Sequence, residues 1–209
     1  MLKENGNSAT MRNASDFALL LPMLMCKTVG RNFGECVRIV YHSVVQHARS
    51  AADEMRTVLQ GISASSAGIQ AVVLTPNADA GGESIREVLS KQRAGFRVFD
   101  HLSRFDYIQW LANCDVILGN SSSGIIEAAS FGVPVINNGD RQRGRERSTN
   151  VIDVPVDTAA IGQALDAALA DGRLTVENVY GDGRAGERIC SLLETLPISQ
   201  DLLLKLNAY

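Results

Sequence analysis

The feature that most constrains the fold is a regular alternation between short apolar runs and longer amphipathic segments. Apolar runs predict strands at 37–41, 69–75, 96–99, 115–118, 134–137 and 151–154. Helical periodicity predicts helices at 46–60, 83–92, 103–111, 123–131, 158–170 and 184–196. Strands that alternate with helices form right-handed βαβ units, and continuous apolar strands are typical of a sheet covered on both faces. The expected class is therefore α/β, a Rossmann-like parallel sheet with helices on both faces.

Length and composition indicate one domain with extensions. The chain has 209 residues, of which 45% are hydrophobic, an ordinary globular balance. We expect the Rossmann-like domain at 35–197, a carboxyl-terminal tail at 198–209, and an irregular leader or the remnant of an amino-terminal domain at 1–34. The apolar run at 17–26 is shorter than the roughly 20 residues that a membrane helix needs, and Pro22 interrupts it. A cytoplasmic protein without a membrane segment is predicted.

Charge and cysteine usage exclude other classes. The net charge is −3 and the pI about 5.6, whereas nucleic-acid and membrane-surface proteins usually need a basic face. The four cysteines include no CxxC pair, so no metal site is expected.

Candidate site residues, most of them polar, follow the ends of several predicted strands. His42 follows the first, Asn77 the second and Leu102 the third, whereas the segment GNSSSG begins at Gly119 and GDRQRGR begins at Gly139. In an open α/β sheet ligands bind at the carboxyl ends of the strands. These residues are therefore expected along one rim.

Two of these segments favour an anion. The serines of GNSSSG lie between a strand and a helix, where free N–H groups and hydroxyls can bind phosphate, although a serine-rich helix cap would look the same. Residues 141–147 hold four arginines, which suit phosphate oxygens, although a solvated basic loop is the alternative; Arg147 in particular is expected to be solvated. Glu127 can complement the helix dipole or accept from ribose hydroxyls, and His42 can be structural or an acid/base group.

Taken together, these motifs resemble the hydrolysing UDP-N-acetylglucosamine 2-epimerases. The resemblance rests on NSSSGIIEA at 120–128, FGVPVIN at 131–137 and GDRQRGR at 139–145, with PNADAG at 76–81 and a strand that ends in Tyr41-His42. It covers about residues 36–196, with the motifs in the family's order. The non-hydrolysing enzymes tend instead to carry Ser-Gly-Gly followed by a double Glu, which this chain lacks.

The resemblance implies one half of a glycosyltransferase type B fold, with UDP held between two Rossmann-like domains. By the resemblance, Ser121, Ser122 and Arg141 would bind the diphosphate of UDP. Glu127 would bind the ribose, and Leu102 and Asn77 would line the uridine side. His42 would lie near the diphosphate and the sugar as the catalytic residue. The family's chemistry eliminates UDP from UDP-N-acetylglucosamine, and water then adds to give N-acetylmannosamine for sialic or nonulosonic acid synthesis. It uses no metal or cofactor, and a homo-oligomer is expected at full length.

Two departures leave alternatives open. The family is nearly twice as long, and its amino-terminal domain with the proton-transferring carboxylates is not recognisable here. Ser43 also stands where the family usually has Pro. The chain is thus expected to contain the UDP-binding half of the enzyme. A UDP or UDP-sugar binding module without turnover, or an epimerase of a UDP-diacetylbacillosamine-type sugar, fits as well. A flavodoxin-like regulatory domain would not need GNSSSG and GDRQRGR together.

Overall fold

A computed structural model describes residues 35–92 and 96–197. The chain divides into two compact units with a boundary between Val179 and Tyr180, and each is described separately. The expected leader at 1–34 and tail at 198–209 lie outside the described residues.

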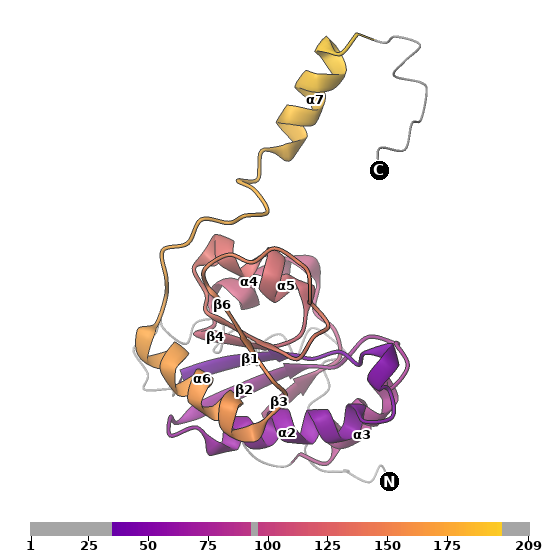
Figure 1. The fold of residues 1–209 in the computed structure, drawn as a ribbon, viewed down its shortest axis with the longest axis vertical. Helices are drawn as coiled ribbons and strands as arrows, with labels where there is room; N and C mark the ends of the chain where they lie inside the picture. The colour runs from indigo at the N-terminus through magenta and orange to yellow at the C-terminus, as the bar shows by residue number, and fades with distance from the viewer. Residues whose placement is uncertain (1–34, 93–95, 198–209) are drawn as a thin grey trace, which may run out of the picture. The chain divides into compact units, whose positions relative to one another are not determined.

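The first unit is built on a parallel sheet of six strands in the order β3-β2-β1-β4-β5-β6 (Figure 1). The strands are β1 (Glu35–Val40), β2 (Ile69–Leu74), β3 (Phe96–Phe99), β4 (Val116–Gly119), β5 (Val135–Asn138) and β6 (Val151–Val154). In the centre of the sheet Ile39 pairs with Val73 on one side and Leu118 on the other. The Rossmann-like parallel sheet predicted from the sequence is confirmed.

Helices cover both faces of the sheet, as predicted (Figure 1). One face carries α2 (Ala51–Ala64), α3 (Gly82–Ser90) and α6 (Thr158–Asp171). The other carries α4 (Arg104–Ala112), α5 (Ser122–Ile126) and the 3₁₀ turn η2 (Ala128–Phe131). The change of face occurs at the crossover from β3 through α4 to β4, so the strand order reverses between β1 and β4. That reversal is where ligands bind in doubly wound sheets.

The central strand shows why both faces must be covered. Val37 and Ile39 enter the apolar cluster under α2, whereas Cys36 and Val40 enter the cluster under α4. Arg38 shares the second face, is 1% exposed, and lies with its guanidinium 4.6 Å from the centre of the Trp110 ring. The aromatic face offsets part of the cost of burying the cation.

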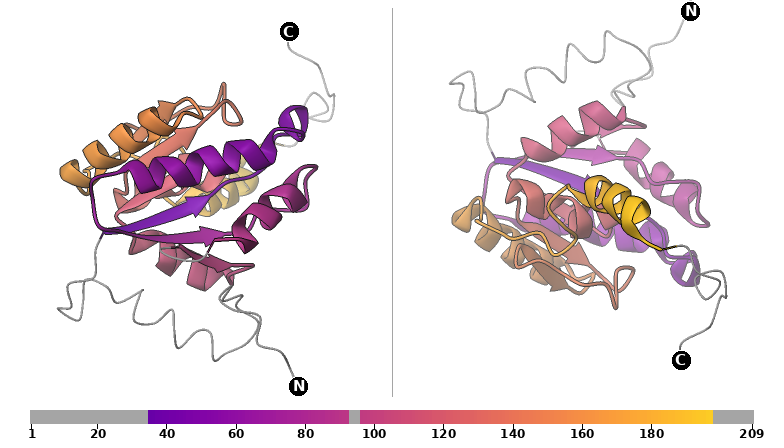
Figure 2. Two further views of the ribbon diagram at one scale, coloured as in Figure 1. Left: turned by 90° about the horizontal axis from the view of Figure 1, so that it is seen from below. Right: turned by 90° about the horizontal axis from the view of Figure 1, so that it is seen from above.

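The helix expected at 46–60 begins later and ends later than its periodicity suggested. A single 3₁₀ turn, η1 (Val45–His47), precedes α2, which continues to Ala64, beyond the predicted end at residue 60. Gly61 explains the extension, because a Cβ there would lie 2.5 Å from the Ile161 side chain. This glycine lets α2 and α6 pack closely side by side (Figure 2).

The helix expected at 123–131 is divided in two. α5 ends at Ile126, and after Glu127 the chain tightens into η2, where Ser130 N–H donates to the Glu127 carbonyl at 3.1 Å. Gly132, with a φ of 63°, ends this segment. A Cβ at that position would lie 2.2 Å from the Leu174 carbonyl oxygen, so the close approach of that segment requires glycine.

The second unit contains α7 (Ala185–Thr195), the last helix predicted from the sequence. Its exposed apolar side chains, Ile189, Leu192 and Leu193, recur at helical spacing. Among residues 35–92 and 96–197, no helix is both long and apolar enough to span a bilayer.

Candidate functional site

The site lies at the carboxyl ends of β1 and β4, which are neighbours in the sheet. Gly119 ends β4 with a φ of 141°, and a Cβ there would lie 2.2 Å from the Val40 carbonyl oxygen, so only glycine allows the two strand ends to approach this closely. The next residue, Asn120, is 1% exposed. Its Oδ1 accepts from His42 N–H at 2.7 Å and its Nδ2 donates to the His42 carbonyl at 2.8 Å. One amide therefore fixes the backbone of His42.

Asn120 also reaches the loop after β5. Its carbonyl oxygen accepts from Arg141 Nη1 at 3.0 Å and from Gln142 Nε2 at 2.8 Å. We call residues 119–124 the serine loop and residues 139–147 the arginine loop. Sequence analysis quoted Asn120 only as part of a motif and gave it no role; a buried amide between two loops is a property of the tertiary fold.

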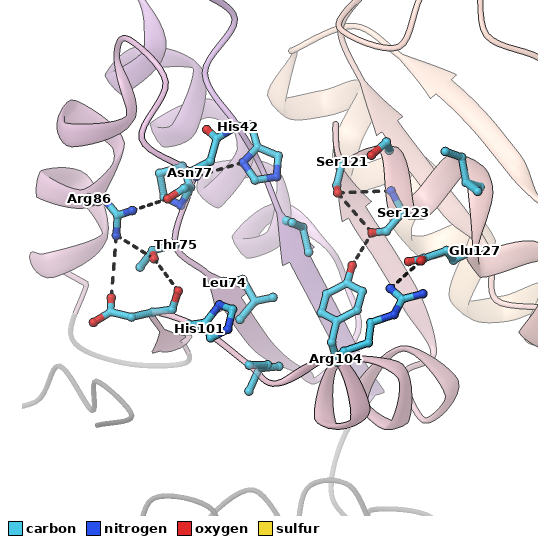
Figure 3. A pocket seen from close by; sticks show the side chains of 17 residues that line it. His42, Leu74, Thr75, Asn77, Arg86, His101, Arg104, Ser121, Ser123 and Glu127 are labelled. Carbon is cyan, nitrogen blue, oxygen red and sulfur yellow. Dashed lines mark hydrogen bonds and ion pairs between the residues drawn. The ribbon is translucent and has the colours of Figure 1, made fainter. Parts of the chain in front are cut away.

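A cavity of about 670 Å³ opens beside the carboxyl ends of β1 and β4 (Figure 3). Six of the seven side chains implied by the family resemblance line it: His42, Asn77, Leu102, Ser121, Ser122 and Glu127. They come from the ends of β1, β2 and β3 and from the serine loop with α5, so the predicted rim is formed. A volume between about 300 and 1,000 Å³ is usual for small-molecule sites.

His42 is held as a neutral side chain. Its Nδ1 accepts from Asn77 N–H at 3.3 Å, so a neutral ring carries its proton on Nε2. Burial lowers the pKa of His42 to about 4, and the positive charge of Arg141 adds to the shift, whereas Asp79 opposes it. In this arrangement Nε2 carries the proton that the imidazole can donate to a ligand, and it is not placed to accept one there.

Hydroxyl groups dominate the serine loop. Ser121 caps α5, because its Oγ accepts from Ser123 N–H at 3.4 Å, and it also lies 3.2 Å from Ser123 Oγ. Ser123 Oγ in turn contacts the hydroxyl of Tyr107 from α4. Ser122 Oγ has no hydrogen-bond partner among the described residues. Since α5 has only five residues, its dipole is small, and the hydroxyls and N–H groups must supply most of the attraction for an anion.

Ion pairs hold two carboxylates of the cavity. Glu127 pairs with Arg104 Nη1 at 2.6 Å, and Asp100 lies 3.9 Å from Arg86 Nη1. Arg86 also donates to Thr75 Oγ1 at 2.8 Å (Figure 3). Sequence reasoning did not single out Arg86 or Arg104. Arg86 reaches the cavity from α3, and Arg104 reaches it from α4 on the opposite face of the sheet.

The arginine loop places its four cations differently. Arg141 is half-buried, bonds to Asn120, and lines two adjoining cavities of about 530 and 490 Å³. Arg143 and Arg145 are exposed. Arg147 was expected to be solvated, and this expectation is wrong: its side chain is 25% exposed, its Nε lies 2.7 Å from Asp153, and its Nη2 donates to the Gln142 carbonyl at 3.1 Å. The ion pair between Arg147 and Asp153 connects the arginine loop to β6.

In the described ranges, 35–92 and 96–197, no group of three or more His, Cys, Asp or Glu side chains is placed to hold a metal ion.

Known proteins resemble this chain in sequence. The family model described as UDP-N-acetylglucosamine 2-epimerase matches residues 21–194. A "UDP-N,N'-diacetylbacillosamine 2-epimerase (hydrolyzing)" of Legionella pneumophila is 46% identical over 173 residues, which are 82% of this chain and 45% of that protein. A "GDP/UDP-N,N'-diacetylbacillosamine 2-epimerase (hydrolyzing)" of Campylobacter jejuni is 33% identical over 123 residues, 57% of this chain and 32% of that protein. The chain thus spans less than half the length of these relatives.

Solved structures agree with the fold. The UDP-GlcNAc 2-epimerase of Neisseria meningitidis, solved with UDP-GlcNAc bound, matches with a TM-score of 0.61 and 16% identity, over 86% of this chain and 50% of that one. At this identity the likeness supports the fold alone. The family model, however, covers most of the chain, including both loops and the ends of β1 and β2. The chain belongs to the UDP-N-acetylglucosamine 2-epimerase family, in its hydrolysing branch.

Proposed function

We propose that the first unit binds the UDP moiety of a UDP-N-acetyl sugar and serves as the nucleotide-binding half of a hydrolysing UDP-sugar 2-epimerase. The observation that carries the proposal is the arrangement at the carboxyl ends of β1 and β4. There the Ser121 and Ser122 hydroxyls and the neutral His42 line the main cavity, and Asn120 binds both the His42 backbone and the guanidinium of Arg141. Hydrogen-bond donors without a competing carboxylate in direct contact suit a diphosphate.

We expect the nucleotide to lie in one direction. Asn77 follows β2 and Leu102 follows β3, and the uridine would lie on this side of the cavity. Glu127, which is paired with Arg104, would accept from the ribose hydroxyls. The diphosphate would then extend past Ser121 and Ser122 toward Arg141. The sugar bonded to the second phosphate would leave the main cavity on the Arg141 side.

The chemistry assigned to this half is stabilisation of the leaving group. In the elimination, a base removes the proton on the sugar's C2, a C1–C2 double bond forms, and the C1–O bond breaks with its electrons on the phosphate oxygen. Arg141 and the serine hydroxyls would stabilise the charge that develops on UDP. His42 would donate from Nε2 to the same oxygens. Water then adds to the unsaturated sugar and releases the free 2-epimer.

None of the carboxylates that line the main cavity is a good candidate for the base. Glu127 and Asp100 each face an arginine in an ion pair, so their oxygens are already engaged and are not free to take a proton from the sugar. We therefore expect the chain alone to release little UDP from UDP-N-acetylglucosamine. A positioned base contributes about 10²–10⁴-fold.

Two UDP sugars are candidates for the substrate. UDP-N-acetylglucosamine follows from the family description. A UDP-N,N'-diacetylbacillosamine-type sugar is favoured by the name of the Legionella pneumophila relative, at 46% identity. A role in sialic or nonulosonic acid synthesis, a cytoplasmic location and a homo-oligomer at full length belong to the same proposal. The chain as a UDP-binding module without turnover is the alternative.

The test is calorimetric titration with UDP, UMP and 2'-deoxy-UDP. UDP should bind more tightly than UMP, because most of the donors surround the diphosphate. The deoxy ligand should bind more weakly than UDP, and Glu127→Gln should remove that difference while leaving the order of UDP and UMP intact. Equal affinities for UDP and UMP would overturn the diphosphate assignment.

A further inference from the structure

Three hydroxyl groups form a line that ends in the main cavity. Tyr107 Oη contacts Ser123 Oγ, and Ser123 Oγ lies 3.2 Å from Ser121 Oγ. Figure 3 shows the two contacts in sequence from α4 to the serine loop. Either oxygen of each pair can donate, so geometry alone leaves the direction of the protons open.

The ligand would settle this direction. Each hydroxyl has one proton to donate, and the oxygens of an ionised diphosphate only accept. If Ser121 donates to a phosphate oxygen, its own oxygen is free to accept from Ser123 Oγ, in addition to the Ser123 N–H that it already receives. Ser123 then accepts from Tyr107. All three protons point toward the phosphate, and aligned hydrogen bonds of this kind strengthen one another.

Tyr107 is well placed to start this line. Its ring is partly buried and packs against Trp110, with ring centroids 5.6 Å apart and planes inclined by 47°. Trp110 is itself 1% exposed, so the tyrosine ring has a fixed support. Burial raises the pKa of Tyr107, which keeps the hydroxyl protonated. The group therefore has a proton to donate.

We propose that Tyr107 is a positioning residue, whose hydroxyl orients the Ser123 and Ser121 protons toward the bound diphosphate. The proposal rests on the proposed function, since it needs a phosphate at Ser121. It goes beyond the proposed function by giving a role to a side chain that is separated from the phosphate by two hydroxyls, those of Ser123 and Ser121. A residue of α4 thus determines the direction in which the hydroxyls of the serine loop donate.

The experiment compares UDP and uridine binding by Tyr107→Phe, which keeps the ring against Trp110 and removes only the hydroxyl. UDP affinity should fall about three- to tenfold, the usual range for one hydrogen bond between neutral groups. Uridine binding, followed by ligand-observed NMR, should not change. Ser123→Ala should weaken UDP by a similar factor, and the double variant should be little worse than either single one, because both changes break the same line.

Tyr41→Phe is the matched control. It also removes a tyrosine hydroxyl from the rim, here one that donates to Glu54 at 2.8 Å outside the main cavity, and it should leave UDP affinity unchanged. Unchanged UDP binding by Tyr107→Phe, an equal loss of UDP and uridine binding, or additive effects of Tyr107→Phe and Ser123→Ala would each overturn the proposal. If Tyr107→Phe does not fold, the same comparison on Ser123→Ala decides. A wild-type chain that binds no UDP would instead remove the proposed function, and this proposal with it.

Discussion

The serine loop and the arginine loop follow neighbouring strands but differ in how they present positive potential. The serine loop uses neutral donors, all within one short turn and fixed by contacts to each other and to Tyr107. The arginine loop uses full charges on long side chains, and only Arg141 of its four arginines is directed to the serine loop. The serine loop therefore offers neutral donors in fixed positions, whereas the arginine loop offers positive charge on long side chains.

The difference shows why a cluster of like residues should not be treated as one feature. The arginine loop looks uniform in the sequence, yet Arg141 reaches Asn120, Arg147 anchors the loop to Asp153, and Arg143 and Arg145 face solvent. In contrast, the hydroxyls of Ser121 and Ser123 are in contact with each other, and Ser123 is also in contact with Tyr107. The following predictions test this division of roles.

The largest effect is expected from Arg141→Ala. Removing a charged donor from the diphosphate should cost about 1.5–3 kcal/mol of binding free energy, a loss of roughly ten- to hundredfold in UDP affinity by titration calorimetry. Arg143→Ala removes the same charge from an exposed position of the same loop and should change affinity by less than about threefold. Equal losses in the two variants would mean that the loop attracts UDP only through its overall charge.

A smaller and different effect is expected from Arg147→Ala. Loss of its contacts to Asp153 and the Gln142 carbonyl should lower the free energy of unfolding by about 1 kcal/mol, measured by urea denaturation, since the pair is only partly buried. UDP affinity should fall much less than in Arg141→Ala. A greater loss of UDP binding in Arg147→Ala would show that the roles assigned within the arginine loop are reversed.

A pH-dependent effect is expected for His42, whose backbone the serine loop holds through Asn120 and whose pKa Arg141 helps to lower. With a folded-state pKa of about 4 and an unfolded value near 6.5, the folded state prefers the neutral ring. Its contribution to stability is complete above about pH 6.5, is lost as the pH falls toward 4, and changes no further below that. The slope cannot exceed about 1.4 kcal/mol per pH unit.

His42→Asn should make the free energy of unfolding fall less between pH 6.5 and 5, because the amide can still accept from Asn77 N–H but does not titrate. Arg141→Ala should also reduce this fall, by a smaller amount, since burial is the main cause of the shift and Arg141 the second. Denaturation curves at pH 5, 6 and 7.5 measure both changes. Parallel pH profiles for the wild type and His42→Asn would contradict the assignment.

The sequence was sufficient for the sheet and for the rim. The strands predicted at 69–75 and 96–99 are short, mainly apolar runs with polar flanks, a pattern that the local sequence alone displays. The structure has β2 and β3 there. Once the strands are parallel, residues after their carboxyl ends must share an edge, which is why His42, Asn77 and Ser121 could be grouped before their positions were known. Their roles toward UDP stay predictions.

What the sequence missed depends on contacts between distant segments. The extension of α2 to Ala64 follows from the fit of Gly61 against Ile161, a contact that spans a hundred positions of the chain. Arg104 and Tyr107 belong to the site because the crossover brings α4 beside α5. Their own neighbours along the chain form an ordinary capped helix, in which Ser103 Oγ accepts from Asp106 N–H.

Asn120 has a consequence for the kinetics of binding. Its amide and carbonyl together make four hydrogen bonds, to the His42 N–H and carbonyl and to the side chains of Arg141 and Gln142. The relative positions of the imidazole, the hydroxyls and the guanidinium are thus established during folding. The conformational entropy of assembling them is already lost before any ligand arrives. We therefore expect such a pocket to bind the proposed nucleotide in one diffusive step, with an association rate proportional to ligand concentration and without a separate closing phase within this domain.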